Sequence, residues 1–211
     1  MADATFDTKQ FGIKEVADVR FYKVGDVEVD TTSGKVVYTG NSEPTAVLAL
    51  DTLKVSTLEF TAEQAEARGG KGNPPLIIWD YGREVNVTLE DATMSIDSLE
   101  VMFGDKVQGS TNTIISINAQ KFPGTYTIVG KTYARDIDGI DHIFTFYIPK
   151  AKVQSENTFT MEAEGDPTVF NMSLRVLRGN AKGDMVQFIM EENTAKTVNP
   201  EISWTLTKKG V

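Results

Sequence analysis

One histidine and its acidic neighbours are the first place where this sequence could do chemistry. His142 ends the segment 136–142, in which three aspartates suggest a calcium loop or an acid–base pair. An EF-hand loop needs glycine at its sixth position and glutamate at its twelfth. Counting from Asp136, glycine falls at the fourth position and a tyrosine at the twelfth. We therefore interpret this segment as an exposed hairpin turn that holds no metal.

Two further patterns suggest catalysis or nucleotide binding, and neither has the required spacing. Residues 69–73 resemble a phosphate-binding loop in composition, but the residue after Lys71 is glycine and two prolines follow, which excludes the helix that a P-loop requires. Carboxylates that could form a glycosidase pair are numerous, for example Glu84, Glu90, Glu162 and Glu164. With one histidine and no cysteine, most catalytic triads are excluded. The sequence therefore predicts a non-enzymatic protein without a cofactor.

Composition and charge narrow the class of protein. The 211 residues fit one compact domain, and 40% hydrophobic and 24% charged residues are ordinary for a folded chain. The net charge of −9 disfavours ordinary DNA binding, because that affinity comes from Lys and Arg on phosphates. The same repulsion suits a conduit through which DNA passes without sticking. Neither a signal peptide nor an apolar run of about 18 residues is present, so we expect no secretion and no membrane contact.

The alternation of apolar and polar residues predicts a mainly β protein. The predicted strands cover residues 16–24, 27–29, 36–39, 46–50, 53–61, 76–81, 83–90, 111–118, 124–135, 142–148, 156–164, 169–177 and 185–190, with a late strand-like run at 202–207. Turn residues predict hairpins at 30–34 and at Asp138-Gly139, and a third that pairs the last two strands through 179–184. One helix is expected over residues 95–103, with Asp97 as N-cap, Glu100 completing a capping box and Gly104 as the stop.

These elements predict an antiparallel β-sandwich or partial barrel with one flanking helix, an extended loop and terminal arms. We expect an N-terminal arm over residues 1–14, the body over residues 15–190 and a C-terminal arm over residues 191–211. Within the body, residues 61–75 read as a long loop, and loops of this length are usually functional or disordered. We therefore expect this loop to be a contact surface.

Two blocks of the chain resemble phage proteins. Residues 53–92 resemble virion structural proteins of tailed phages. Residues 149–177 resemble the closing strands of phage tail tube proteins, in which one strand ends in Glu-Gly-Asp-Pro and the last sheet strand follows. The resemblance implies two packed sheets with one helix, six-membered rings stacked into a hollow cylinder, and DNA ejected through the lumen.

The resemblance also implies where the chain acts and with what. It implies a virion tail component made in the host cytoplasm, with copies of itself as the main partner. Tape measure, sheath or baseplate proteins are further expected partners, and passing DNA is expected to make no specific contact. Closing the sheet between subunits would cover strand edges that are otherwise exposed.

Candidate residues for these roles follow from the polar strand faces and the long loop. In residues 83–90, Val85, Val87 and Leu89 alternate with polar residues, and residues 156–164 repeat the pattern. The resulting lumen-lining candidates are Glu84, Asn86, Thr88, Glu90, Thr158, Thr160, Glu162 and Glu164. The candidates for contacts between rings or subunits are Glu63, Glu66, Arg68, Gly69, Gly70, Lys71, Asn73 and Pro74, together with the two terminal arms.

Two alternatives stay open at this point. One is another virion component, such as a head decoration, tail terminator or baseplate protein. The other is a carbohydrate- or receptor-binding β-sandwich, which usually displays clustered exposed aromatic residues. Trp79 and Trp204 are far apart in the sequence, and Trp79 lies in an apolar run that we expect to be buried.

Overall fold

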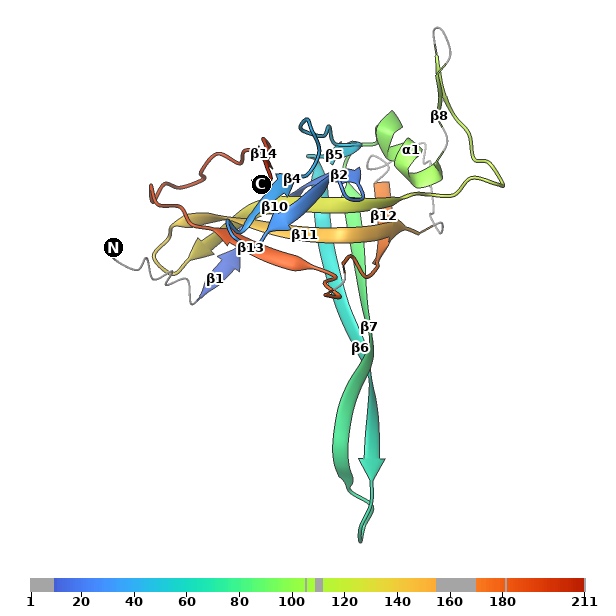
Figure 1. The fold of residues 1–211 in the computed structure, drawn as a ribbon, viewed down its shortest axis with the longest axis vertical. Helices are drawn as coiled ribbons and strands as arrows, with labels where there is room; N and C mark the ends of the chain where they lie inside the picture. Colours follow the sequence, from blue (N-terminus) through green and yellow to red (C-terminus); the bar gives the residue numbers. More distant parts are fainter. Residues whose placement is uncertain (1–9, 105, 109–111, 155–169, 181, 211) are drawn as a thin grey trace, which may run out of the picture.

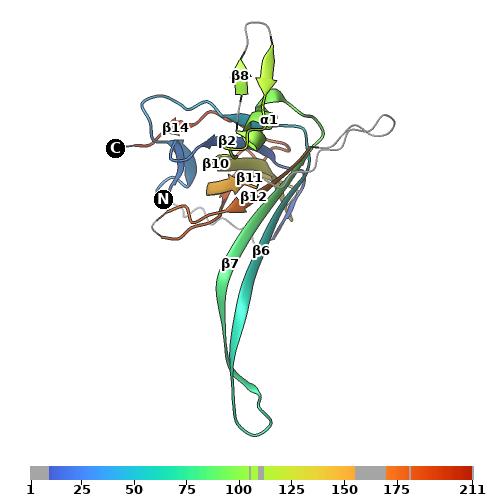
Figure 2. The same ribbon diagram turned by 90° about the vertical axis from the view of Figure 1, so that its right-hand side faces the viewer.

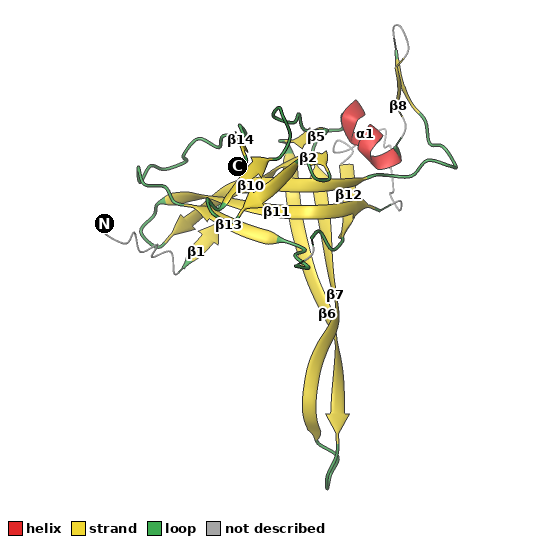
Figure 3. Ribbon diagram, in the orientation of Figure 1, coloured by secondary structure: helices red, strands yellow, loops and turns green. Residues whose placement is uncertain are grey.

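A computed structural model of the chain describes residues 10–104, 106–108, 112–154, 170–180 and 182–210. This part is mainly β with one helix, α1 (Ile96–Phe103), as the alternation predicts (Figures 1 and 3). The strands are β1 (Phe11–Ile13), β2 (Asp18–Lys23), β3 (Val27–Asp30), β4 (Lys35–Tyr38), β5 (Leu48–Leu50), β6 (Leu53–Arg68), β7 (Pro75–Asp91), β8 (Lys106–Gln108), β9 (Thr113–Ile115), β10 (Thr125–Asp136), β11 (Asp141–Val153), β12 (Phe170–Val176), β13 (Gln187–Glu191) and β14 (Thr207–Lys208).

A nine-stranded antiparallel sheet forms the body. Its strand order is β5-β2-β10-β11-β12-β7-β6, with β1 added to β10 and β13 added to β11. Strands β12, β7 and β6 cross the direction of β10 and β11, so the sheet folds over and its two layers face each other (Figure 1). Within the described residues the end strands β5 and β6 do not pair with each other, so the sheet is an open sandwich and not a closed barrel.

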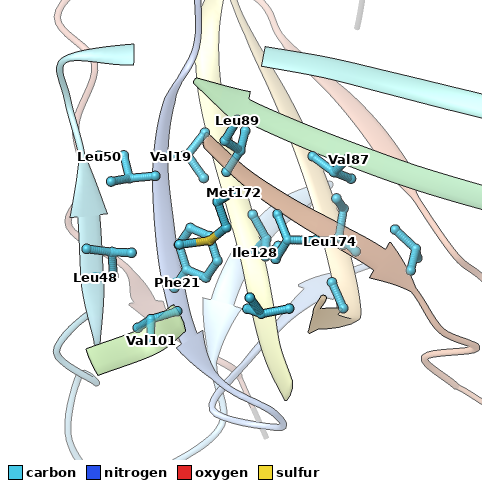
Figure 4. Close-up of a cluster of buried hydrophobic side chains, with 14 of the residues drawn as sticks. Val19, Phe21, Leu48, Leu50, Val87, Leu89, Val101, Ile128, Met172 and Leu174 are labelled. Atoms are coloured by element: carbon cyan, nitrogen blue, oxygen red, sulfur yellow. The ribbon is translucent and has the colours of Figure 1, made fainter. Parts of the chain in front are cut away.

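The main core lies between these two layers. Val19 and Phe21 of β2, Ile128 of β10 and Met172 and Leu174 of β12 meet there (Figure 4). All five side chains are fully or almost fully buried. Burial of each such side chain contributes about 1.5–3 kcal/mol, so this cluster is the main source of stability in a chain without disulfides.

A smaller core lies on the other face of the sheet. Here the β3–β4 hairpin covers Tyr22, Val129 and Tyr147, and Leu206 from the C-terminal segment joins them. The Tyr147 hydroxyl donates a hydrogen bond to the carbonyl of Val27 at 2.9 Å, and burial raises the pKa of Tyr147 to about 12. The predicted hairpin at residues 30–34 is thus confirmed, and its role is to close this second core.

The helix lies where the sequence predicts it, but its N-cap is different. The cap is Ser95, whose hydroxyl accepts a hydrogen bond from the backbone N–H of Ser98, and Ser98 reciprocates as the capping-box partner. Asp97 lies inside the first turn, so the predicted box of Asp97 and Glu100 is wrong. Ser95 takes the position because its extended backbone precedes the first helical residue, as an N-cap requires. Gly104 ends the helix in the left-handed conformation, as predicted.

The long loop predicted over residues 61–75 is mostly strand. Residues up to Arg68 continue β6, which pairs with β7 along its whole length, and only residues 69–74 form a turn. The break predicted at Gly82 is also wrong, because β7 continues through it as a β-bulge. Gly82 has φ +61°, and two residues of β7 stand opposite one residue of β6 at this point. Glycine often indicates a turn, but here the pairing with β6 continues on both sides of Gly82 and keeps the strand intact.

Other predicted pairings and bounds also change. Strand β12 pairs with β7 and β11, while β13 pairs with a distant part of β11, so the predicted hairpin of these two strands is wrong. Their turn at residues 179–184 is instead a connection between two parts of the sheet. Strand β9 is shorter than predicted. Of the strand-like run predicted over residues 202–207, only Thr207 lies in a strand, β14. The strand predicted over 156–164 lies outside the described residues.

Candidate assembly surfaces

The distal half of the β6–β7 hairpin projects far from the body. Two perpendicular views show it leaving the folded layers as an isolated two-stranded ribbon (Figures 1 and 2). Its register pairs Glu63 with Tyr81, Ala65 with Trp79 and Ala67 with Ile77. Directly opposed residues share a face, so three large apolar side chains lie on one face with two alanines beside them.

These apolar side chains are exposed in the single chain. Trp79 and Tyr81 are 50% exposed and Ile77 is 61% exposed, and the neighbouring Leu76 and Ile78 are similar. The expectation that Trp79 is buried is therefore wrong. The reason is that β7 leaves the sheet before this point, so neither layer covers it. A contiguous exposed apolar surface of this kind marks an interaction site.

The sequence-predicted contact residues lie on this projection. Glu63, Glu66 and Arg68 belong to β6, and Arg68 forms an ion pair with Glu66 at 2.5 Å on the face opposite Trp79. The turn that follows needs left-handed backbone at Gly70, Gly72 and Asn73. The structure therefore brings the predicted set Glu63, Glu66, Arg68, Gly69, Gly70, Lys71, Asn73 and Pro74 together at the distal end of one hairpin. Whether they contact another subunit stays a prediction.

The proximal half of β7 carries the polar face expected of the lumen candidates. Val85, Val87 and Leu89 are buried, as the alternation predicts. The side chains of Glu84, Asn86, Thr88 and Glu90 alternate with them and are exposed or half-buried. Their neighbours across the register extend the polar face onto β12 and β6, through Asn171, Ser173 and Arg175 on one side and Thr57, Glu59 and Thr61 on the other.

The charges on this face are mixed. Glu84 forms an ion pair with Arg175 of β12, and Lys152 of β11 lies next to Arg175 in the register. Carboxylates at Glu59, Glu84 and Glu90 thus share the face with two cations. The other four lumen candidates, Thr158, Thr160, Glu162 and Glu164, lie outside the described residues.

The segment predicted as a C-terminal arm packs against the body. Trp204 lies against the Arg20 guanidinium and near the Lys131 ammonium, at 4.3 and 5.3 Å from its ring centroid. Lys131 donates to the carbonyl of Ser203 at 2.7 Å, and burial lowers its pKa. The backbone N–H of Leu206 donates to Glu43 at 2.7 Å. Sequence alone missed this docking because polar spacing hid the few residues that anchor it.

A buried carboxylate at the first residue of β11 links three chain segments. Asp141 accepts two hydrogen bonds from Arg135, at 2.7 and 3.0 Å, and one from the backbone N–H of Asn199 at 2.9 Å. Lys14, from the predicted N-terminal arm, lies 3.4 Å away. The Arg135 contact, foremost among these, holds the pKa of Asp141 far below its usual range. The carboxylate therefore ties both ends of the described chain to the sheet.

The acidic segment around His142 is a hairpin turn, as predicted, but the predicted exposure is wrong for Asp141 and His142, which are buried. Asp136 accepts hydrogen bonds from the backbone N–H groups of Asp138 and Ile140, both at 2.9 Å, and lies 3.1 Å from the His142 ring. The Ile140 bond is the main reason that the pKa of Asp136 is lowered. The described residues contain no cluster of metal-ligating side chains, and their single helix is too short to cross a membrane.

The fold is a mainly β sandwich from which one hairpin with exposed apolar side chains projects. The YomU/Tube protein family matches the chain over residues 29–114 and 107–188, well over half its length. The chain belongs to this family of tube proteins. This match supports its assignment as a phage tail tube protein, a structural component of the virion tail. No curated protein matches the chain.

Proposed function

We propose that the chain polymerises as stacked hexameric rings that form the phage tail tube, through which DNA is ejected into the host. The observation that carries this proposal is the projecting hairpin, whose Ile77, Trp79 and Tyr81 are uncovered in one copy. Covering five half-exposed apolar side chains would contribute on the order of 5 kcal/mol per copy. This favours contact between copies and not a free projection.

Strand β6 supports the same proposal. It is the last strand of the sheet order, so its outer edge has no partner among the described residues. A long unpaired edge promotes pairing with another chain, and a closed assembly removes the hazard. The polar face that includes Glu84, Thr88 and Glu90 would then line the lumen. Its carboxylates would repel DNA phosphates and so prevent tight binding of the passing DNA.

The test is microscopy of the purified protein with a matched variant. Negative staining of the wild-type chain is expected to show hollow tubes or six-fold rings. Replacing residues 63–81 by a two-residue Asn-Gly turn should leave a folded monomer, because the core lies elsewhere, and should abolish tubes. A wild-type protein that stays monomeric, with neither tubes nor rings, would overturn the proposal. Tape measure, sheath or baseplate proteins would be further partners of such a tube.

A further inference from the structure

An apolar groove lies beside β6, separate from the hairpin. It has a volume of about 680 Å³, and its lining includes Phe11, Val16, Leu58, Phe144 and Phe188. The rings form a ladder: Phe11 and Phe144 have centroids 5.8 Å apart, and Phe144 and Phe188 are stacked at 5.6 Å. Phe60, on β6, extends the ladder at 6.3 Å from Phe188.

The groove is incomplete in one copy. Phe11, Phe60 and Phe188 are each about half exposed, although they belong to the same aromatic ladder. Ser56 also lines the groove, and no group within the described residues hydrogen-bonds to its buried hydroxyl. The hairpin of the same copy leads away from the body (Figure 1), and none of its distal residues lines the groove.

The apolar face of the hairpin has the chemistry that the groove lacks. Ile77, Trp79 and Tyr81 supply aromatic and aliphatic surface, and Ala65 and Ala67 keep the ribbon thin on that face. Aromatic pairs are favourable in offset or edge-on contact, so Trp79 and Tyr81 suit a groove lined by the stacked rings of Phe144 and Phe188.

We propose that this groove is the receptor for the Ile77–Trp79–Tyr81 face of the hairpin of a second copy. The inference rests on the proposed function, because it assumes contact between copies. One chain carries both the donor surface and the acceptor surface, and the two differ, so a head-to-tail contact can repeat from copy to copy. A two-fold contact between grooves would leave the hairpins uncovered. The groove is therefore assigned to the hairpin.

Single cysteines can test this, because the chain has none of its own. Ala65→Cys places a thiol on the hairpin face beside Trp79, and Val16→Cys places one at the groove. Val24→Cys is the matched control, since Val24 is 45% exposed against 42% for Val16 but lies away from the groove. Two single variants are mixed, assembled and treated with a short bis-maleimide. A linked dimer that needs both variants must join two copies.

Dimer from Ala65→Cys mixed with Val16→Cys, with little from Ala65→Cys mixed with Val24→Cys, is the expected result. A third mixture uses Ile117→Cys, a thiol on the exposed apolar surface near α1 and β9. Linkage there instead, or no linkage at Val16→Cys in assembled protein, overturns the groove assignment. Microscopy of the same samples separates the two proposals: absent tubes and rings defeat the proposed function, whereas tubes without this linkage defeat only the groove.

Discussion

The two halves of β7 both carry large apolar side chains, and these have opposite surroundings. From Val85 to Leu89, every second side chain is buried between the layers. From Leu76 to Tyr81, large side chains on both faces are exposed, because only β6 accompanies the strand there. The difference teaches that the apolar content of a strand does not show whether the same copy covers it. The proximal half stabilises one copy, and the distal half stays uncovered in that copy.

The strongest way to break this comparison is to place the same charge in each half. Val87→Asp should prevent folding, because an unpaired carboxylate in the core costs more than about 4 kcal/mol. Ile77→Asp should change the free energy of unfolding by less than about 0.5 kcal/mol and should abolish assembly. Urea unfolding monitored by circular dichroism, with microscopy for tubes, checks both. An Ile77→Asp chain that does not fold would mean that the distal half belongs to the core.

A second contrast is between the exposed hairpin and the C-terminal segment, which packs against the body of the same copy. Asp141 holds this segment through Asn199. Asp141→Asn should reduce the free energy of unfolding by roughly 2 kcal/mol at pH 7, because charge-assisted hydrogen bonds from Arg135 and Lys14 weaken. Thermal unfolding measures this, with the exposed Asp138→Asn on the same turn as control.

The same variant has a defined pH dependence. The pKa of Asp141 is lower in the folded chain than in the unfolded one, where it is about 3.9. Its stabilisation is therefore complete above the unfolded value and is lost as pH falls toward the folded value. The difference between wild type and Asp141→Asn should shrink in acid. A difference that stays constant from pH 7 to about pH 2 would contradict the role given to the carboxylate.

The joint between the two halves offers a smaller effect. Gly82 has φ +61°, and a side chain there would meet only Glu63 at 3.9 Å. Gly82→Ala should therefore cost about 1 kcal/mol from backbone strain alone, and Gly82→Asn should cost less, because asparagine tolerates this conformation. Urea titration gives both values. Equal losses of unfolding free energy for the two variants would contradict this prediction. They would show that the geometry of the bulge sets the loss, and not the preference of the residue for left-handed backbone.

A small effect on folding is also expected at the polar face. Glu84→Lys combined with Glu90→Lys should change the free energy of unfolding by less than about 1 kcal/mol, since exposed ion pairs contribute little. In assembled phage, the added positive charge should slow genome ejection. Glu192→Lys with Glu201→Lys changes the charge equally on the C-terminal segment and should not slow it. Unaltered ejection kinetics in the first variant would remove the lumen assignment.

Sequence predicted the β class, the helix and the buried face of Val85, Val87 and Leu89, because each follows from local periodicity. It failed where pairing with another strand decides the outcome. Residues 61–68 continue a strand because β7 lies beside them, and Gly82 bulges because β6 holds the register. Neither partner is visible from local spacing.

The candidate surfaces show the same limit. The contact residues from Glu63 to Pro74 were found through segment length and glycine content, although the element is a hairpin and not a loop. The apolar face of Trp79 and the groove of Phe144 and Phe188 were missed, because residue type cannot show exposure. The docking of Trp204 depends on Arg20 and Lys131, which are distant in sequence.

The hairpin leaves the body from one side only (Figures 1 and 2). If copies join head to tail through it, every polymer has two chemically different ends. One end has uncovered hairpins, and the other has unfilled grooves. Growth and capping at the two ends would then need different proteins, and a copy added in the reverse sense would find no complementary surface.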